Sequence, residues 1–362
     1  MGKRKICIIC DTEYQLLNAL GLINNGFVKN SYIDFYIDEK IIDRYEKLVN
    51  ELEMFWKVNQ VIAFDARSAD SMLQKITKFF SPTLYIKSRM KSSNIFCEYE
   101  EIYIAVPTHF SVSLIFMNKN AAIYYYEDGT ASYTENLVNL IYSMLSKVIY
   151  RFFGNDLSRV YPQLMYVNNL DFCTNCMCKE VRQSRMIKSG DNEYVNRLNV
   201  IFKTNTELYM NKRIMYLTQP LWQYNTYSSS IKRIDEQIKQ SILNLENLVI
   251  RKHPADKCIY DDVKYVVDTD SGLWELICED AITNDSILIA LYSTAQLVPY
   301  ILYSKMPYIV FLYYLYSDLL SKNDIDNYDE TVKVLKQKYT DVSKIVVVKT
   351  ITELEDFLSK IV

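Results

Sequence analysis

The chain is short of two residue types on which many nucleotide-binding and metal-dependent enzymes rely. Its 362 residues include only 7 glycines and 2 histidines, and the glycines are about a third of average usage. No three glycines form the G-x-G-x-x-G fingerprint, and Gly21 and Gly26, which have Walker spacing, are followed by Phe27-Val28. His109, which we expect to be structural, and His253 lie far apart, and there is no H-E-x-x-H motif. These absences argue against Rossmann-type NAD enzymes, P-loop NTPases and histidine-based zinc enzymes.

The cysteine content and the net charge argue against further classes of protein. The 8 cysteines are spread too thinly for a disulfide scaffold, so we expect reduced thiols. Cys173 and Cys176 have C-x-x-C spacing, but no second ligand pair lies at zinc-finger distance, and we expect no metal and no other cofactor. A net charge of -3 provides no general positive field, which excludes a nucleic acid as the main partner.

The chain has little that predicts a signal peptide or a membrane-spanning helix. The first apolar run stops at Asp11, and the most apolar stretch, 300–320, is interrupted by Lys305, Pro307 and Asp318. We therefore predict a cytoplasmic protein.

One stretch could still bring the protein to the inner face of a membrane. Residues 75–91 contain basic but no acidic residues, and such a segment can rest on anionic lipid. The simpler interpretation, which we favour, is a solvated face with a few packed aromatic rings. The residues concerned are Lys75, Lys78, Lys87, Arg89 and Lys91, interleaved with Phe79, Phe80, Tyr85 and Ile86.

The first half of the chain alternates short apolar runs with segments of helical spacing. This alternation is typical of a parallel sheet covered by helices. An apolar stripe over 137–152 then predicts an amphipathic helix whose apolar face we expect in the core. The expected strands are 5–10, 32–37, 61–64, 101–106 and 122–126, and the expected helices are 12–24, 39–52, 68–80 and 109–118.

After a less regular region at about 154–205, which we interpret as a crossover with insertions, the alternation returns. We therefore predict an α/β protein of GT-B type: two doubly wound Rossmann-type domains, 1–205 and 206–362, facing a central cleft where such folds place ligands. The expected strands of the second domain are 213–218, 248–252, 263–267, 287–291, 308–313 and 345–349, and the expected helices are 231–245, 272–280, 294–304, 328–339 and 351–361.

Polar motifs follow several of the expected strands. In the first domain Glu127-Asp128-Gly129 comes directly after a strand. Adjacent carboxylates there point to opposite sides, and crowding raises a carboxyl pKa towards the range of a general base. Gly129 would permit positive φ or close approach of a substrate. Taken alone, such a tripeptide is more often a plain turn.

The second domain has polar strand ends suited to an anion. Arg251-Lys252-His253-Pro254 brings two cations and a histidine to the end of a strand, where they could receive a phosphate. Ser293-Thr294 would cap a helix whose N-terminus can hold an anion. Thr218-Gln219-Pro220 ends another strand, and Glu275 opens a helix from which it could bind ribose hydroxyls.

In this order the motifs resemble the [DE]-[DE]-G, H-P and S-[ST] motifs of the bacterial sialyltransferases. Segments 10–17 and 218–221 look most like glycosyltransferase family 52, the lipooligosaccharide and capsule sialyltransferase type, and the resemblance covers nearly the whole chain. It implies a GT-B fold, inverting transfer, CMP-sialic acid as donor, a galactoside acceptor glycan that is often lipid-linked, and no metal. A homodimer is left open.

The resemblance also suggests a role for each motif. Asp128 would be the general base, with Glu127 orienting it or exchanging roles with it. His253 would donate to the leaving phosphate as an acid or as a hydrogen-bond donor. Phosphate charge would be held by Lys252, Ser293 and Thr294, the ribose by Glu275, and the remaining substrate contacts would come from Gly129, Thr218, Gln219 and Pro254.

Several alternatives remain. The base could come from Asp235 or Glu236, although a solvated helix surface explains these residues more simply. Asp268-Thr-Asp270 could be the D-x-D manganese site of a GT-A transferase. The chain could also use a different nucleotide sugar, or be a non-catalytic glycan-binding component of capsule assembly.

Overall fold

The computed structural model describes residues 3–66, 68–90, 98–129, 131–134, 142–173, 178, 180–187, 191–221, 229–260 and 265–361. The chain divides into two compact units, Met1–Phe202 (unit 1) and Lys203–Val362 (unit 2). Within the described residues, every pairing between named strands is parallel. Because parallel sheets need cover on both faces, each unit must supply its own helices.

Unit 1 contains a seven-stranded sheet of order β3-β2-β1-β4-β5-β6-β7. Its strands are β1 (Arg4–Cys10), β2 (Ser31–Asp38), β3 (Gln60–Phe64), β4 (Glu101–Ile104), β5 (Ala122–Tyr126), β6 (Leu164–Val167) and β7 (Val181–Gln183). Its α-helices are α1 (Glu13–Asn24), α2 (Glu39–Arg44), α3 (Leu48–Met54), α4 (Met72–Phe80), α5 (Pro82–Arg89), α6 (His109–Met117), α7 (Ala131–Thr134), α9 (Met144–Phe152) and α10 (Asn192–Phe202).

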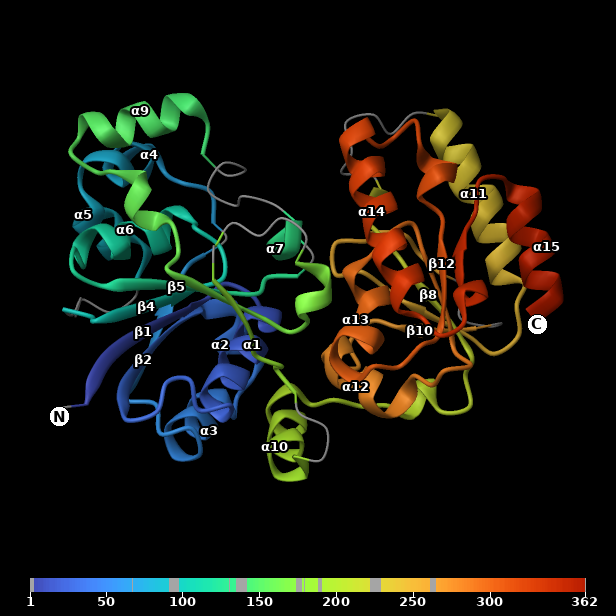
Figure 1. Cartoon of the computed structure of the whole chain (residues 1–362), viewed down its shortest axis with the longest axis horizontal. Coiled ribbons are helices and arrows are strands. Elements are labelled where there is room, and N and C mark those ends of the chain that lie inside the picture. The colour runs from blue at the N-terminus through green and yellow to red at the C-terminus, as the bar shows by residue number, and fades with distance from the viewer. Residues whose placement is uncertain are drawn as a thin grey trace. The chain divides into compact units, whose positions relative to one another are not determined.

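The strand order of unit 1 reverses between β1 and β4, and this reversal distributes the helices over both faces. Helices α1 to α3 lie on one side of the sheet and α4, α5, α6 and α9 on the other (Figure 1). The central strand β1 is buried from Ile6 to Cys10. In a doubly wound sheet, ligands bind beyond the carboxyl ends of the strands next to such a reversal.

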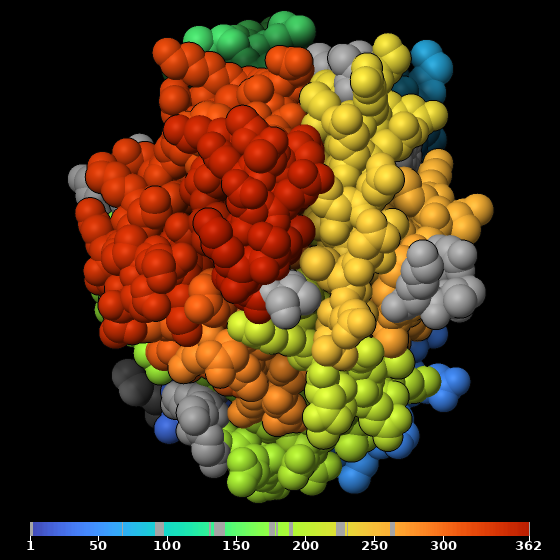
Figure 2. All heavy atoms as spheres, turned by 90° about the vertical axis from the view of Figure 1, so that its right-hand side faces the viewer, coloured from blue at the N-terminus to red at the C-terminus, as the bar shows by residue number. Residues whose placement is uncertain are grey.

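Unit 2 repeats this plan with a six-stranded sheet of order β10-β9-β8-β11-β12-β13. Helices α11 and α15 lie side by side on its surface (Figure 2), where Ser241 Oγ donates to Glu355 Oε1 at 3.1 Å. Its strands are β8 (Ile214–Leu217), β9 (Leu248–Arg251), β10 (Val266–Asp268), β11 (Ile287–Ala290), β12 (Tyr308–Phe311) and β13 (Ile345–Val347). Its α-helices are α11 (Ser229–Leu243), α12 (Trp274–Ala281), α13 (Thr294–Tyr303), α14 (Lys322–Lys338) and α15 (Ile351–Ile361).

The predicted class of two doubly wound Rossmann-type units is confirmed. Two helix predictions in unit 1 were wrong in detail. The helix expected over 39–52 is broken into α2 and α3, with Tyr45 in a non-helical conformation between them. The helix expected over 68–80 begins at Met72, where Ser71 provides a capping box, and is followed by α5, which the sequence did not predict.

The region 154–205 was wrongly interpreted as only a crossover with insertions. It supplies β6 and β7, which complete the first sheet, and α10. The edge strand β7 has only 3 residues, Val181-Arg182-Gln183, and no apolar alternation to reveal it.

The prediction that the apolar stripe over 137–152 faces the core was also wrong. Residues 137–141 lie outside the described part, but Met144, Leu145, Val148 and Phe152 of α9 are exposed, whereas Tyr150 is the residue that faces the core.

Candidate functional site

The carboxylate motif follows β5 at the carboxyl edge of the first sheet, where it meets the first turn of α1. Glu127 is completely buried. Tyr14 donates to its Oε1 at 2.5 Å, Asn168 N donates to its Oε2 at 2.7 Å, and the Tyr133 hydroxyl also donates to Oε2. Burial raises the pKa of Glu127, although these hydrogen bonds act in the opposite direction. With both oxygens engaged inside the protein, Glu127 is suited to positioning and not to exchanging protons with a substrate.

Asp128 is held differently. Gln15 Nε2 donates to its Oδ1 at 2.8 Å, and its backbone N–H donates to Ser132 Oγ at 2.8 Å. Burial raises the pKa of Asp128 to about 6, the hydrogen bond from Gln15 lowers it, and the charge of Glu127 raises it further. No described residue donates a side-chain hydrogen bond to Oδ2, so this oxygen can take a proton from a hydroxyl. A carboxylate with a pKa near 6 is a competent general base at neutral pH.

The orientation of Gln15 is itself determined by its neighbours. Asp11 N donates to Gln15 Oε1 at 2.6 Å, so the amide must turn its Nε2 towards Asp128. Thr12 caps α1 by accepting from Gln15 N at 3.2 Å. Gly129 has φ +97, a conformation that favours glycine and lets the chain turn directly after Asp128.

Sequence reasoning missed two members of this cluster, Tyr133 and Asn168. The side chain of Asn168 donates to Asn18 Oδ1 at 2.8 Å, and its Oδ1 accepts from Met186 N at 2.7 Å. A polar pair, Asn168-Asn169, directly after the apolar strand β6 was the available signal. Tyr14 and Gln15 belonged to the segment that resembles family 52, and the structure places them on Glu127 and Asp128.

In unit 2 the His253 loop follows β9. Its backbone N–H donates to Thr218 Oγ1 at 2.9 Å, and Ala255 N donates to its Nδ1 at 3.1 Å. Desolvation lowers the pKa of His253, while the charge of Asp256 raises it. A neutral ring whose Nδ1 accepts a hydrogen bond carries its proton on Nε2. The imidazole is therefore arranged as an Nε2–H donor, with Pro254 exposed beside it.

Thr218 and Gln219 are used mainly inside the protein. The hydroxyl of Thr218 also bonds to Asp256, and this bond helps to lower the pKa of that carboxyl. Gln219 Nε2 donates to Tyr292 O at 2.5 Å and so connects the ends of β8 and β11, where the strand order reverses. Gln219 Oε1 is buried and has no hydrogen-bond partner among the described residues.

The two cations of the second motif behave differently. Arg251 is not available to a phosphate, because its guanidinium pairs with Asp268, donates to Gly272 O at 2.6 Å and lies 5.5 Å from the Trp274 ring centroid. Lys252 N donates to Asp268 O at 2.9 Å, and no described residue forms a salt bridge with the Lys252 side chain.

Ser293 is the N-cap of α13. Its Oγ accepts from Ala295 N at 3.3 Å, and Gln296 Oε1 accepts from Ser293 N at 3.2 Å, which forms a capping box. Thr294 is the first residue of the helix. Glu275 lies in the first turn of α12 and is partly exposed.

The alternative carboxylates have structural partners. Asp268 of the D-x-D sequence is buried and accepts from Asp270 N, Ser271 N and the Tyr209 hydroxyl, in addition to its ion pair with Arg251. Asp235 is not a solvated surface carboxylate: it is buried, pairs with Lys239 at 2.8 Å and accepts from the Tyr316 hydroxyl at 2.8 Å. Glu236 is exposed. Asp268 is therefore a poor candidate for a metal ligand, and Asp235 is a poor candidate for a general base.

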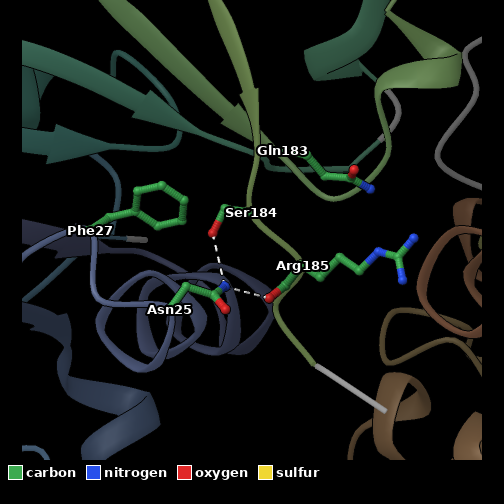
Figure 3. Close-up of a pocket in the computed structure, with 5 residues that line it drawn as sticks. All are labelled: Asn25, Phe27, Gln183, Ser184 and Arg185. Atoms are coloured by element: carbon green, nitrogen blue, oxygen red, sulfur yellow. Dashed lines mark hydrogen bonds between the residues drawn. The ribbon is translucent and has the colours of Figure 1, made fainter.

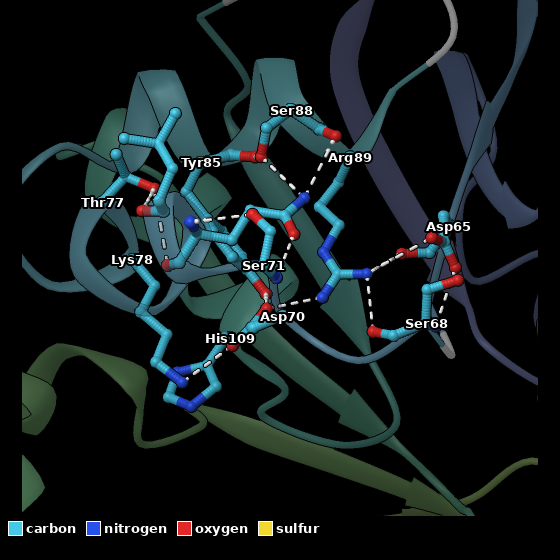
Figure 4. A network of polar contacts seen from close by, with 12 residues as sticks. Asp65, Ser68, Asp70, Ser71, Thr77, Lys78, Tyr85, Ser88, Arg89 and His109 are labelled. Carbon is cyan, nitrogen blue, oxygen red and sulfur yellow. Dashed lines mark hydrogen bonds and ion pairs between the residues drawn. The ribbon is translucent and has the colours of Figure 1, made fainter.

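The basic stretch at 75–91 is not a uniformly solvated face. Asp70 pairs with Lys78 at 2.8 Å and with Arg89 at 2.5 Å, and Arg89 also reaches Asp65 and Ser68 O (Figure 4). Tyr85 and Ile86 are buried, and Lys91 lies outside the described residues. His109 is structural, as expected: its Nδ1 lies 2.7 Å from the Tyr150 hydroxyl, and burial lowers its pKa to about 4.

Three hollows in the described part lie away from these motifs. One of about 270 Å³ lies beside β7, where Asn25 Nδ2 donates to Ser184 Oγ while the side chain of Arg185 points away (Figure 3). A hollow of about 430 Å³ includes Arg4 and Glu101, the first residues of β1 and β4. A third, of about 320 Å³, is lined by Arg213 and Ser286, which precede β8 and β11. The last two therefore lie at the amino ends of the strands, opposite to the motifs.

The described ranges contain neither a metal cluster nor a membrane-spanning helix. No group of three or more His, Cys, Asp or Glu side chains there could hold a metal ion, and Cys176 lies outside these ranges. None of the described helices combines the length and apolar character needed to cross a bilayer.

The chain is similar in structure to the UDP-GlcNAc 2-epimerase of Methanocaldococcus jannaschii in complex with UDP-GlcNAc and UDP. The two share 11% identity over 99% of this chain and 92% of that one, with a TM-score of 0.54. The glycotransferase of kitacinnamycin is also similar, with 8% identity over 99% and 90% and a TM-score of 0.51. No protein-family model and no curated protein matches the chain.

These similarities define the fold class. The chain has a GT-B-like fold of two parallel-sheet Rossmann-like units, which it shares with a glycosyltransferase and a nucleotide-sugar epimerase. At such low identity they do not extend to a reaction, and the likeness to family 52 depends on the sequence motifs.

Proposed function

We propose that this protein is an enzyme that acts on nucleotide sugars, specifically an inverting sialyltransferase. It transfers sialic acid from CMP-sialic acid to a terminal galactose-type sugar of a capsule or lipooligosaccharide glycan, in the cytoplasm. Unit 1 serves the acceptor and unit 2 the CMP-sugar. The observation that carries the proposal is Asp128, a carboxylate with one oxygen held by Gln15 and a pKa of about 6.

The proposed step is a single displacement. Asp128 accepts the proton of the acceptor hydroxyl, whose oxygen forms a bond to the anomeric carbon of sialic acid. The bond from that carbon to the phosphate oxygen of CMP breaks, and the phosphate keeps the electron pair. This follows the logic of inverting glycosidases, with a sugar hydroxyl in place of water.

The unit 2 residues stabilise the departing phosphate. His253 donates a hydrogen bond through Nε2–H, which its neutral ring can do without losing a proton. Lys252 and the amide groups at the start of α13, capped by Ser293, add positive potential. Glu275 binds the ribose of CMP. Thr218 and Gln219 do not contact the substrate but hold the loops that do. This role is supported by the hydrogen bonds of Thr218 with His253 N and of Gln219 with Tyr292 O.

The test is incubation of the full chain with CMP-sialic acid and a panel of galactosides, with the product linkage assigned by specific sialidases. We expect a sialylated product, and turnover that falls by about two orders of magnitude or more in Asp128→Ala and His253→Ala. Activity should persist in EDTA, since the D-x-D carboxylate Asp268 is engaged by Arg251. Near-wild-type turnover of either variant would remove that residue from the mechanism.

A different nucleotide sugar is the second candidate, because a structurally similar epimerase is described with UDP-GlcNAc and UDP. UDP-GlcNAc is therefore offered in parallel, and its consumption in place of CMP-sialic acid would favour this candidate. Calorimetry with CMP tests the third possibility, a non-catalytic glycan-binding protein. CMP binding that is lost in His253→Ala supports the sialyltransferase. Glycan binding without binding of CMP or of UDP-GlcNAc supports a non-catalytic protein.

A further inference from the structure

Two helices on one side of unit 1 expose an unusual amount of apolar surface. Met72 of α4 is 82% exposed, and Met144 and Phe152 of α9 are 78% and 82% exposed. We refer to the exposed apolar residues of α4, α5 and α9, with the adjoining Phe153, as the α4–α9 face. They are Met72, Leu73, Ile76, Phe80, Leu84, Met144, Leu145, Val148, Phe152 and Phe153.

The two helices share a sequence pattern. Residues 71–80 read SMLQKITKFF and residues 143–152 read SMLSKVIYRF. In each, a serine N-cap precedes Met-Leu, an aliphatic residue follows four positions after Met, and Phe follows eight positions after it. These spacings place the exposed apolar side chains within about 100° of each helix circumference. Each helix therefore exposes the same narrow apolar stripe.

The two helices pack against each other and form one surface. Phe79 of α4 lies 5.0 Å from Tyr150 of α9 between ring centroids, and Phe80 lies 6.0 Å from Phe153. Asn155 Nδ2, just after α9, donates to Phe79 O at 3.0 Å. Helices α4 and α9 lie close together on the same side of the sheet (Figure 1). The buried residues of the two helices, Thr77 and Tyr150, are on the side that packs against the rest of unit 1.

The charged side chains of the helices that form this surface are all basic. None of the helices α4, α5 and α9 contains Asp or Glu. Lys78 and Arg89 are held by Asp70, whereas Lys75, Lys87 and Arg151 are exposed. Long basic side chains around apolar ones suit the boundary between anionic headgroups and acyl chains.

We propose that the α4–α9 face is a membrane-docking surface that inserts its apolar side chains into an anionic phospholipid bilayer. Charge complementarity is the reason to prefer lipid: a second copy would oppose cation with cation, whereas anionic headgroups neutralise Lys75, Lys87 and Arg151. The proposal concerns where the protein acts and does not depend on which sugar it transfers.

The experiment is flotation of the full chain with vesicles made of equal parts phosphatidylglycerol and phosphatidylcholine, and with pure phosphatidylcholine vesicles. We expect binding to the anionic vesicles that weakens with salt. The double variant Met72→Glu/Met144→Glu should reduce the bound fraction by about ten-fold or more. Its matched control is Met54→Glu, since Met54 on α3 is 72% exposed but lies outside the face. Lys75→Glu/Lys87→Glu should weaken binding to anionic vesicles, and Lys336→Glu should not.

Melting curves of all variants establish that they are folded, as expected for exposed positions. Sialyl or other transfer to a soluble acceptor should be unchanged in the Met72→Glu/Met144→Glu variant, so a failure of the proposed function and a failure of membrane docking are distinguishable. Absence of wild-type flotation, or equal flotation of the double variant, would overturn the proposal. So would a wild-type dimer in sedimentation that the double variant converts to a monomer without any change in vesicle binding.

Discussion

Asp128 is a carboxyl group that folding makes harder to ionise. Its pKa rises from 3.8 to about 6, mainly through burial and partly through the charge of Glu127. A surface turn would leave such a group fully ionised at small energetic cost. In this fold, ionising Asp128 costs free energy, and no described side chain donates a hydrogen bond to its Oδ2. Active sites often retain this kind of local destabilisation.

This cost leads to a prediction about Asp128→Asn. Because the folded-state pKa is raised, the ionised carboxylate destabilises the fold increasingly as pH rises from about 4 to about 6, and fully above that. At about 1.4 kcal/mol per pKa unit, the variant should be more stable than wild type by up to about 3 kcal/mol at pH 7 and equal to it near pH 4. Asparagine can still accept the hydrogen bond from Gln15.

Urea unfolding of both proteins at pH 4 and pH 7 measures the difference, and turnover measures the loss of the base. A variant that gains stability only at pH 7 and loses at least about 100-fold in turnover fits the assignment. Equal stability at both pH values would show that Asp128 is not desolvated.

At the scale of elements, Glu127 joins segments that are distant in sequence. Its hydrogen bonds connect α1 through Tyr14, α7 through Tyr133 and the end of β6 through Asn168. The carboxylate therefore fixes the positions of three elements around Asp128, and its role is to hold them together.

We expect Glu127→Ala to destabilise unit 1 by about 3 kcal/mol or more, because it leaves several buried donors without an acceptor. Glu127→Gln should cost only about 1 kcal/mol, since its carbonyl oxygen can keep the contacts of Oε2 and its amide can donate to Tyr14. Chemical denaturation gives both values. If the Gln variant were as unstable as the Ala variant, the negative charge itself, and not the hydrogen bonds, would be the feature that matters.

At the scale of the whole molecule, the proposed reaction combines a base from unit 1 with a donor from unit 2, and their protonation states determine the pH profile. Asp128 is active when ionised, so kcat/KM should fall about ten-fold per pH unit below about 6. His253 has a lowered pKa and donates as a neutral ring, so it should add no alkaline limb.

The measurement is kcat/KM between pH 5 and pH 9 in wild type and in His253→Ala. We expect one acidic limb in both proteins, with a lower plateau in the variant. An additional alkaline limb that is present in wild type and absent in His253→Ala would mean that a protonated His253 acts as a general acid.

The sequence predicted parts of this protein unevenly, for physical reasons. Buried parallel strands such as β1 and β5 are continuous apolar runs, so βαβ alternation was readable, but the three-residue edge strand β7 was not. Asp128 could be proposed from the sequence because it follows a strand directly, whereas Tyr133 and Asn168 reach Glu127 only when separate segments converge. The stripe of α9 was detected correctly as amphipathic, yet periodicity does not tell whether an apolar face meets a core or remains exposed.

By itself, the sequence determined the doubly wound architecture and the position of polar motifs at the ends of strands. Its low content of glycine and histidine also argued against several classes of enzyme. These are local properties, set by side-chain periodicity and by which residues follow each strand. Tertiary structure decided which charges are engaged: Arg251 with Asp268, Lys78 and Arg89 with Asp70, Glu127 with two tyrosines. It also decided that Asp128 is desolvated and that two similar helices share one exposed apolar face, because burial and pairing depend on segments that meet only after folding.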